Sequence, residues 1–268
     1  MPATAKLPVY PPPEPAEELA ADPAAEAASN GAAEQIAAAE VARALEGVKE
    51  VLASTDAEFS SRRFMLSKLR KIGVAYCDWH EMARYTDWKN MGQFGVQQIP
   101  TEYVDLLMHV AKLGVRTAVE VGVWYGASSY FTAAVLQRAN PDFKMTMVDN
   151  EDRLVGYPEF SAVLNLEKRI PATAEDCAGE AYDFVFIDGD HSYAGVQRDY
   201  LLLGRHARRA VAFHDVRGAE FDHLEGGTRR FWREFVHHHC QDMAILEFGH
   251  YETPWMGIGL AVKAVDSP

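Results

Sequence analysis

The sequence has few cysteines and no long apolar run. Only Cys77, Cys177 and Cys240 occur among the 268 residues, with no C-x-x-C pair and no spacing typical of disulfides. This usage is typical of a reducing compartment, so we expect a cytoplasmic protein. No apolar run approaches the roughly 20 residues that span a bilayer, and the chain does not open with the basic and apolar regions of a signal peptide. We therefore expect no membrane association.

Basic residues are outnumbered by acidic ones. The chain has 26 Lys and Arg and 39 Asp and Glu, which gives a formal net charge of −13. Because non-specific binding to nucleic acid depends on basic patches, this charge argues against a nucleic-acid partner. A hydrophobic content of 48% over 268 residues is enough for one large α/β domain with an appendage.

Two segments precede the regular part of the sequence. Residues 1–31 are rich in Pro, Ala and Glu, a composition that buries no core and predicts a disordered tail. We expect residues 32–98 to form a helical cap or oligomerisation segment. Its first helix, at about 32–53, carries an apolar stripe at 4-3-4 spacing: Val41, Leu45, Val48 and Leu52. This stripe either forms a homo-oligomer or docking contact or packs on the chain's own domain, and the pattern leaves both open.

Aromatic residues are concentrated between positions 59 and 95. We expect this stretch to cover the domain that follows and to contribute to a substrate pocket. The candidate lining residues are Trp79, His80, Tyr85, Trp88 and Phe94. For each of them alone, packing is the simpler explanation.

Helices and strands alternate over residues 99–268. Helices are predicted at about 101–113, 127–139, 158–165, 173–179 and 192–205, and strands at 117–122, 144–149, 168–170, 182–188 and 210–215. Continuous apolar strands in this order predict a parallel sheet with right-handed crossovers. The two last strands, in "MAILEF…MGIGLAV", are close enough to pair as a hairpin. We therefore expect an α/β fold: a doubly wound, mostly parallel, seven-stranded Rossmann-like sheet with a C-terminal antiparallel hairpin.

The stretch "VEVGVWYGASS" follows the first predicted strand. It places Glu120 and Gly122 at the strand end, Gly126 at the start of a helix and Ser128 in its first turn. The spacing is G-x-x-x-G, which differs from the pyrophosphate-binding G-x-G-x-x-G. A glycine turn below a helix N-terminus still offers backbone N–H groups to a carboxylate, although tight packing alone also produces such turns.

Asp149 ends the second predicted strand. An acid at this place can bind both hydroxyls of a ribose, although a helix cap or a loop acid is the alternative. Together with the glycine turn, Asp149 favours a nucleoside ligand that carries a carboxylate and no phosphate. S-adenosylmethionine (SAM) matches that description.

Acids and histidines follow the fourth and fifth strands. Asp188 ends "YDFVFID", and His214 and Asp215 end "AVAFHD". Because adjacent parallel strands lie about 4.8 Å apart, Asp188 and Asp215 are expected to face one cleft. Two converging carboxylates repel each other unless a cation lies between them, and Mg²⁺ typically takes one or two carboxylates. Each residue alone also has an ordinary explanation as a cap or turn residue.

The sequence resembles the class I SAM-dependent methyltransferase fold over about residues 95–262. The features that carry this resemblance are the motif E-x-G-x-x-x-G-x-S, the acid that ends the second strand and the closing hairpin. Three further stretches, "GVQQIPTEYVDLL", "FIDGDHSYAGVQRD" and "FHDV", resemble one group within it. That group contains sugar O-methyltransferases of the macrocin and mycinamicin types and cephalosporin-hydroxylase-like proteins. The resemblance implies a SAM-dependent O-methyltransferase that acts on a hydroxyl of a sugar or glycosylated small molecule, with Mg²⁺ as a further cofactor.

The resemblance also implies roles for individual residues. The acids at Asp188 and Asp215 are metal ligands in the related sugar O-methyltransferases, and the histidine at the position of His191 is the general base. His214 stands where these relatives often have an acid, which leaves the third ligand open between His214 and Asp190.

The cofactor contacts implied are Gln98, Glu120, Gly122, Gly126, Ser128, Asp149 and Asp188. Two other functions stay open: a cephalosporin-hydroxylase-like enzyme, and a SAM-binding partner without activity in a biosynthetic complex.

Overall fold

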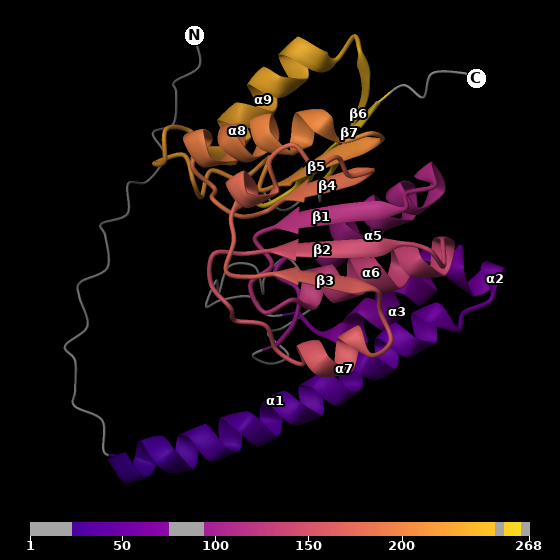
Figure 1. Cartoon of the computed structure of the whole chain (residues 1–268), viewed down its shortest axis with the longest axis vertical. Helices are drawn as coiled ribbons and strands as arrows, with labels where there is room; N and C mark the ends of the chain where they lie inside the picture. Colours follow the sequence, from indigo (N-terminus) through magenta and orange to yellow (C-terminus); the bar gives the residue numbers. More distant parts are fainter. Residues whose placement is uncertain (1–22, 75–93, 250–254, 264–268) are drawn as a thin grey trace, which may run out of the picture. The chain divides into compact units, whose positions relative to one another are not determined.

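Seven strands form one sheet in the order β3-β2-β1-β4-β5-β7-β6 (Figure 1). The computed structural model describes residues 23–74, 94–249 and 255–263. The strands are β1 Thr117–Val121, β2 Lys144–Val148, β3 Leu166–Arg169, β4 Phe184–Ile187, β5 Ala210–His214, β6 Met243–Phe248 and β7 Ile258–Lys263. Strands β1 to β5 are parallel, and β7 pairs antiparallel with both β5 and β6. The predicted fold class is confirmed.

The helices follow the predicted alternation, with shorter elements after β2 and β3. The α-helices are α1 Pro23–Leu52, α2 Asp56–Phe59, α3 Arg62–Ile72, α5 Pro100–Val110, α6 Ala127–Ala139, α7 Tyr157–Ser161, α8 Tyr193–Leu202 and α9 Gly227–His239, and the 3₁₀ helices are η1 Ala111–Leu113, η2 Ala174–Cys177 and η3 Gly204–His206. The helix expected at 173–179 is the short 3₁₀ turn η2. Within the described part of the chain, no helix combines the length and apolarity needed to cross a membrane.

Alternate residues of each strand enter different hydrophobic layers. In β4, Phe184 and Phe186 belong to the layer that contains α3, α5 and α6, whereas Val185 and Ile187 belong to the layer that contains α8 and α9. Successive side chains of a strand point to opposite faces, so a sheet covered on both faces needs apolar residues at every position. This explains the uninterrupted apolar run of β4.

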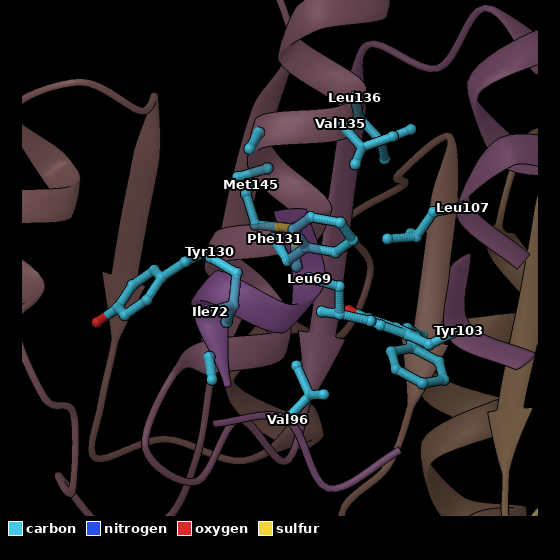
Figure 2. Packing of buried hydrophobic residues seen from close by; sticks show 14 of the residues in the cluster. Leu69, Ile72, Val96, Tyr103, Leu107, Tyr130, Phe131, Val135, Leu136 and Met145 are labelled. Carbon is cyan, nitrogen blue, oxygen red and sulfur yellow. The ribbon is translucent and has the colours of Figure 1, made fainter. Parts of the chain in front are cut away.

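The layer around α5 and α6 is packed with large side chains (Figure 2). Tyr103 of α5 is fully buried, and its ring centroid lies 6.3 Å from that of Phe131 of α6. The Tyr103 hydroxyl lies 2.6 Å from the Thr132 hydroxyl and donates to the carbonyl of Ser128 at 2.8 Å. These contacts fix the first turns of α6, the helix that follows the glycine turn.

The apolar stripe of α1 packs on the chain's own domain. Val41 and Val48 are buried, and Leu45 and Leu52 are partly buried against the same layer as α3 and α5. Residues Ala37–Pro268 form one compact unit. The stripe is therefore covered within its own chain, as in the second of the two interpretations left open above.

The N-terminal boundary differs from the predicted one. Helix α1 begins at Pro23, earlier than the predicted start at about residue 32, since the Ala- and Glu-rich composition that favours a helix already begins there. Residues 1–22 of the predicted tail lie outside the described residues. The same is true of Trp79, His80, Tyr85 and Trp88, the proposed aromatic lining, whereas Phe94 is buried in the core.

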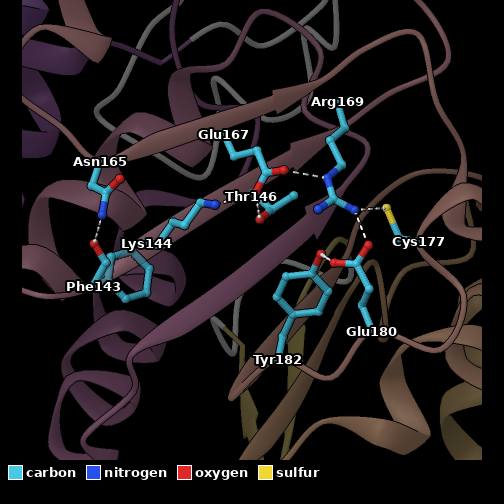
Figure 3. A network of polar contacts seen from close by, with 9 residues as sticks. All are labelled: Phe143, Lys144, Thr146, Asn165, Glu167, Arg169, Cys177, Glu180 and Tyr182. Carbon is cyan, nitrogen blue, oxygen red and sulfur yellow. Dashed lines mark hydrogen bonds and ion pairs between the residues drawn. The ribbon is translucent and has the colours of Figure 1, made fainter.

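A polar network holds the connection between β3 and β4 (Figure 3). Arg169, at the end of β3, donates to Glu167 at 2.8 Å and pairs with Glu180, which accepts a hydrogen bond from Tyr182 at 2.9 Å. Arg169 also contacts the sulfur of Cys177 at 3.6 Å. The network ties both ends of the segment that contains residues 172–174 to the sheet, and these residues line the cavity described next.

Candidate active site

A cavity of about 560 Å³ lies at the carboxyl ends of the central parallel strands. Its walls include Gln98, Gly122, Asp149, Asp188, His191 and Asp215. Strands β1 and β4 are neighbours, and the strand order runs outward from them in opposite directions. Ligands of doubly wound sheets bind at such a switch point. The position and the volume are those of a small-molecule site.

The glycine turn brings the end of β1 against the end of β4. Gly122 has φ +85°, and a Cβ atom at this position would lie 2.3 Å from the carbonyl oxygen of Asp188. Gly126 has φ +91° and is the N-cap of α6, where a Cβ atom would lie 2.7 Å from the ring of Tyr130. Gly126 does not line the cavity, so backbone conformation and packing explain why this position is a glycine.

Glu120 points away from the cavity into the layer of α6. Its side chain is fully buried and accepts hydrogen bonds from the hydroxyls of Ser128 at 2.5 Å and Ser129 at 2.6 Å. Burial raises the pKa of Glu120 to about 8, although both serine hydrogen bonds act in the opposite direction. Ser128 lines the cavity and Glu120 does not. The structure therefore gives Glu120 the role of fixing the start of α6, which differs from the direct cofactor contact expected from the sequence.

Asp149 organises the glycine turn from the neighbouring strand. Its Oδ2 accepts the backbone N–H groups of Val123 and Trp124, each at 2.9 Å, and its Oδ1 accepts that of Glu151 at 3.2 Å. Asp149 lines the cavity, as expected for a residue that binds ribose hydroxyls.

Trp124 and Arg153 are cavity residues that sequence reasoning missed. Trp124 is 40% exposed and adopts a positive φ of 49°. The guanidinium of Arg153 lies 4.1 Å from the centroid of its ring. A tryptophan inside a glycine turn was the signal in the sequence, because a large aromatic residue exposed in a loop often belongs to a binding site.

His214 lies between the two acids of the neighbouring strands. Its Nδ1 is 3.0 Å from Oδ1 of Asp188 and 3.4 Å from Oδ2 of Asp215. All three side chains are at least nine-tenths buried. Asp188 and Asp215 thus converge as predicted, and an imidazole of the chain itself lies between them.

The charges of this cluster stabilise one another. Burial alone would lower the pKa of His214, but the charges of Asp188 and Asp215 and their hydrogen bonds raise it well above its ordinary value. Burial also acts to raise the pKa of Asp215, whereas the charge and hydrogen bond of His214 lower it below its ordinary value. We infer that His214 is a cation between two carboxylates at neutral pH.

His191 approaches the same acids from the loop after β4. Its Nδ1 lies 3.3 Å from Oδ2 of Asp215, and its ring stacks on Phe221 with centroids 4.2 Å apart. One ligand atom each from Asp188, His191 and Asp215 lies within 4.8 Å of the others. The structure therefore groups His191 with the two acids as a possible donor set, whereas the Nδ1 of His214 is already engaged by hydrogen bonds to both.

Asp190 and Gln98 have different positions around this cluster. Asp190 accepts the backbone N–H of Ser192 at 2.9 Å and covers Gly195, so it has a turn role and is not grouped with Asp188, His191 and Asp215. Gln98 is buried and donates from Nε2 to Oδ2 of Asp188 at 2.5 Å. Its Oε1 has no hydrogen-bond partner among the described residues. Gln98 is therefore placed to offer an acceptor to a ligand.

The donor set of Asp188, His191 and Asp215 is chemically suited to a divalent cation. Carboxylate oxygens are the preferred protein ligands of Mg²⁺, and a set with one imidazole also suits Mn²⁺ or Fe²⁺. With two acids and one imidazole within 4.8 Å of one another, these residues match the requirements of such an ion.

The doubly wound sheet with a closing hairpin and a cavity at the β1–β4 switch point is the fold expected for a class I methyltransferase. Residues 119–216 match the model of a family described as a methyltransferase domain. The matched range runs from β1 to the end of β5 and includes Asp149, Asp188, His191 and Asp215. The enzyme class expected from the sequence, a SAM-dependent methyltransferase, is confirmed by this match.

Similar solved structures include two O-methyltransferases. One is TomG from Streptomyces achromogenes, involved in tomaymycin synthesis and solved with SAM, at 19% identity over 75% of this chain and 90% of that chain, with a TM-score of 0.49. The other is from Bacillus cereus and was solved with S-adenosylhomocysteine (SAH). It has 18% identity over 81% of this chain and 95% of that chain, also with a TM-score of 0.49. Among curated proteins, no sequence matches this chain.

Proposed function

We propose that the chain transfers the methyl group of SAM to a hydroxyl oxygen of a sugar or glycosylated small molecule, assisted by a divalent cation. The observation that carries this proposal is the meeting of Asp188, His191 and Asp215 on a cavity that Asp149 also lines. Two acids with an imidazole at one end of the cavity suit hydroxyl activation, and an acid at the end of β2 suits a ribose.

The cofactor would occupy the part of the cavity between β1 and β2. Asp149 has carboxylate lone pairs left for the ribose hydroxyls after it has accepted the N–H groups of the glycine turn. The N-terminus of α6, with Ser128 in its first turn, offers N–H groups to the methionine carboxylate. The Oε1 of Gln98 offers an acceptor to the methionine ammonium group.

His191 is the proposed general base. The contact of its Nδ1 with Asp215 orients the ring and favours the tautomer in which Nε2 accepts a proton. In the reaction, the hydroxyl oxygen forms a bond to the methyl carbon as the carbon–sulfur bond breaks. The sulfur keeps the electron pair, and the hydroxyl proton passes to Nε2 of His191.

Asp188 and Asp215 are the proposed ligands of the divalent cation. When bound, such an ion lowers the pKa of an alcohol that it contacts. His191 lies close enough to serve as a third ligand in place of its role as base. Replacement of His191 by Ala distinguishes the two roles. If His191 is the base, the substitution lowers the rate with little change in Mg²⁺ affinity. If His191 is a ligand, it lowers both the rate and the Mg²⁺ affinity.

The test is incubation of the protein with SAM, Mg²⁺ and a pool of sugars and glycosides, followed by detection of a methylated product and of S-adenosylhomocysteine (SAH). We expect both products, and we expect Asp188→Asn and Asp215→Asn to abolish them while SAH still binds in calorimetry. Asp242→Asn, at an exposed position in the turn between α9 and β6, is the matched control and keeps full activity.

Other outcomes correspond to the two alternatives. A cephalosporin-hydroxylase-like enzyme would convert an acceptor without giving a methylated product, and a partner without activity would bind SAH tightly and turn over no acceptor. A homo-oligomeric state and a cytoplasmic location, both expected from the sequence, stay predictions.

A further inference from the structure

Glu40 is a buried acid on α1 that the proposed methyl transfer does not use. Its side chain is 5% exposed, and its Oε2 accepts the backbone N–H of Phe94 at 2.9 Å. A glutamate is rarely buried unless its carboxylate has a partner. Phe94 lies 54 residues further along the chain. The hydrogen bond therefore ties the N-terminal helix to the segment that enters the cavity wall at Gly95.

The segment after Phe94 forms one wall of the cavity and is tightly packed. Residues 95–98 all line the cavity. The N–H of Val96 donates to the carbonyl of Gly73 at 3.0 Å, and a Cβ atom built on Gly95 would lie 2.5 Å from the carbonyl carbon of Gly73. Because backbone packs on backbone here, a shift at Phe94 cannot be absorbed within the next two residues and passes along the wall.

Arg43 holds the other side of this close contact. Its Nε donates to the carbonyl of Lys71 near the end of α3 at 3.1 Å, and its Nη2 would lie 3.5 Å from a Cβ atom built on Gly73. Glu40 and Arg43 are three residues apart, so they share one face of α1. This face of α1 therefore holds both of the chain segments that pack against each other beside the cavity.

Val41 extends the contact of α1 to a second part of the cavity wall. A Cβ atom built on Gly156 would lie 2.7 Å from Cγ1 of Val41. Gly156 is the N-cap of α7 and ends the loop in which Asn150 and Arg153 line the cavity. Two consecutive residues of α1, Glu40 and Val41, thus contact the segments that continue into two walls of the cavity.

We propose that Glu40 is a positioning residue for the cofactor, because its hold on the N–H of Phe94 fixes Gln98. The proposal rests on the cofactor site proposed above, in which Oε1 of Gln98 accepts from the methionine ammonium group. That oxygen is aimed by the hydrogen bond from Nε2 of Gln98 to Asp188 at 2.5 Å. Without the anchor at Phe94, the wall segment must be ordered when the cofactor binds, and this ordering costs affinity. Helix α1 thereby acts in ligand binding as well as in packing.

The test measures the binding of SAH to the full chain by calorimetry, at a temperature at which circular dichroism shows every variant to be folded. Glu40→Leu removes the acceptor of the Phe94 N–H and should weaken SAH binding at least about tenfold. In Glu40→Gln, the amide oxygen still accepts this N–H, so the affinity should stay within about threefold of the wild type. Glu46→Leu, the same substitution at an exposed position of α1, is the matched control and should bind SAH like the wild type.

A double-mutant cycle with Gln98 separates positioning from general support of the fold. Gln98→Ala should itself weaken SAH binding, and adding Glu40→Leu should weaken it by no more than about a further twofold, because Glu40 acts through Gln98. Effects that multiply in the double variant overturn the proposal. Glu40→Ala provides the same readout if the Leu variant does not fold.

The remaining outcomes are equally decisive. Wild-type affinity in Glu40→Leu, or in Gln98→Ala, overturns the proposal. An equal loss in Glu40→Gln and Glu40→Leu also overturns it, because acceptance of the Phe94 N–H would then not be what matters. Failure of the wild-type chain to bind SAH contradicts the proposed function itself.

Discussion

The Nδ1 of His214 lies 3.0 Å from Oδ1 of Asp188, and this hydrogen bond joins the carboxyl ends of two neighbouring parallel strands. Asp215, the next residue after His214, adopts a positive φ of 58° and brings its carboxylate to within 3.4 Å of the same nitrogen. The chain itself thus supplies an imidazole between two buried acids, whose charges raise the pKa of His214 well above its ordinary value. This arrangement makes His214 important for folding as well as for the site.

Replacement of His214 by Ala should destabilise the protein. The change leaves Asp188 and Asp215 buried beside each other without their shared partner, and loss of one member of a buried charged group typically costs about 3–5 kcal/mol. We expect the free energy of unfolding, measured by urea denaturation with a chelator present, to fall by about 3 kcal/mol. His238→Ala, at an exposed position on α9, should change it by less than about 0.5 kcal/mol. A loss below about 1 kcal/mol in His214→Ala would show that the acids do not depend on it.

Replacement of Asp149 by Asn should weaken cofactor binding more than folding. The amide oxygen can still accept the N–H groups of Val123 and Trp124, but the charge that strengthens hydrogen bonds to a ribose is lost. We expect SAH to bind about tenfold more weakly in calorimetry, with the melting temperature nearly unchanged. Asp152→Asn, which alters an acid paired with Lys168, serves as the control. Unchanged SAH affinity in Asp149→Asn would remove Asp149 from the cofactor site.

Much of the fold could be predicted because its signals are local. Helix α6 occupies Ala127–Ala139 as predicted, and each strand of the alternation was found within a few residues. The elements after β2 and β3 are shorter than predicted, since a few apolar residues at helical spacing do not show where a helix stops. The meeting of Asp188 with Asp215 was also predictable, because strand order places the ends of β4 and β5 side by side.

The orientation of individual polar side chains was harder to predict. Glu120 lies two residues after Ala118 in β1, and the period of two places both on the face toward α6. That period, together with the two serines at the start of α6, was a signal that Glu120 would be buried there. The contact of His214 with two acids depends on the backbone turn at Asp215, and the sequence contains no local sign of it.

Glu120 should make the stability of the protein depend on pH. Its pKa of about 8 in the folded chain lies above the ordinary value of 4.5, so folding takes up a proton between these values. The stabilisation is complete below about pH 4.5 and is lost as the pH rises through 8. From pH 5 to pH 8, the free energy of unfolding of the wild type should decrease relative to that of Glu120→Gln by on the order of 3 kcal/mol. Glu159→Gln, at an exposed position, should follow the wild type. Parallel curves for wild type and Glu120→Gln would contradict the assigned ionisation.

Gly122 should be the glycine at which substitution is most damaging. A Cβ atom there would lie 2.3 Å from the carbonyl oxygen of Asp188 and 2.4 Å from the Cα of Gly189, and neither backbone atom can move without shifting β4. Gly122→Ala should therefore lower the free energy of unfolding by more than about 3 kcal/mol, through overpacking added to the cost of positive φ. Urea denaturation of this variant provides the measurement.

Gly114 allows the two costs of the Gly122 substitution to be separated. It has φ +65°, and nothing lies within 4 Å of a Cβ atom built on it. Gly114→Ala should thus show only the conformational cost of about 1–2 kcal/mol. The difference between the two variants then measures the close approach of the turn after β1 to the loop after β4. Equal losses in both would mean that the approach is loose, and Asp188 would then not be held in place by the glycine turn.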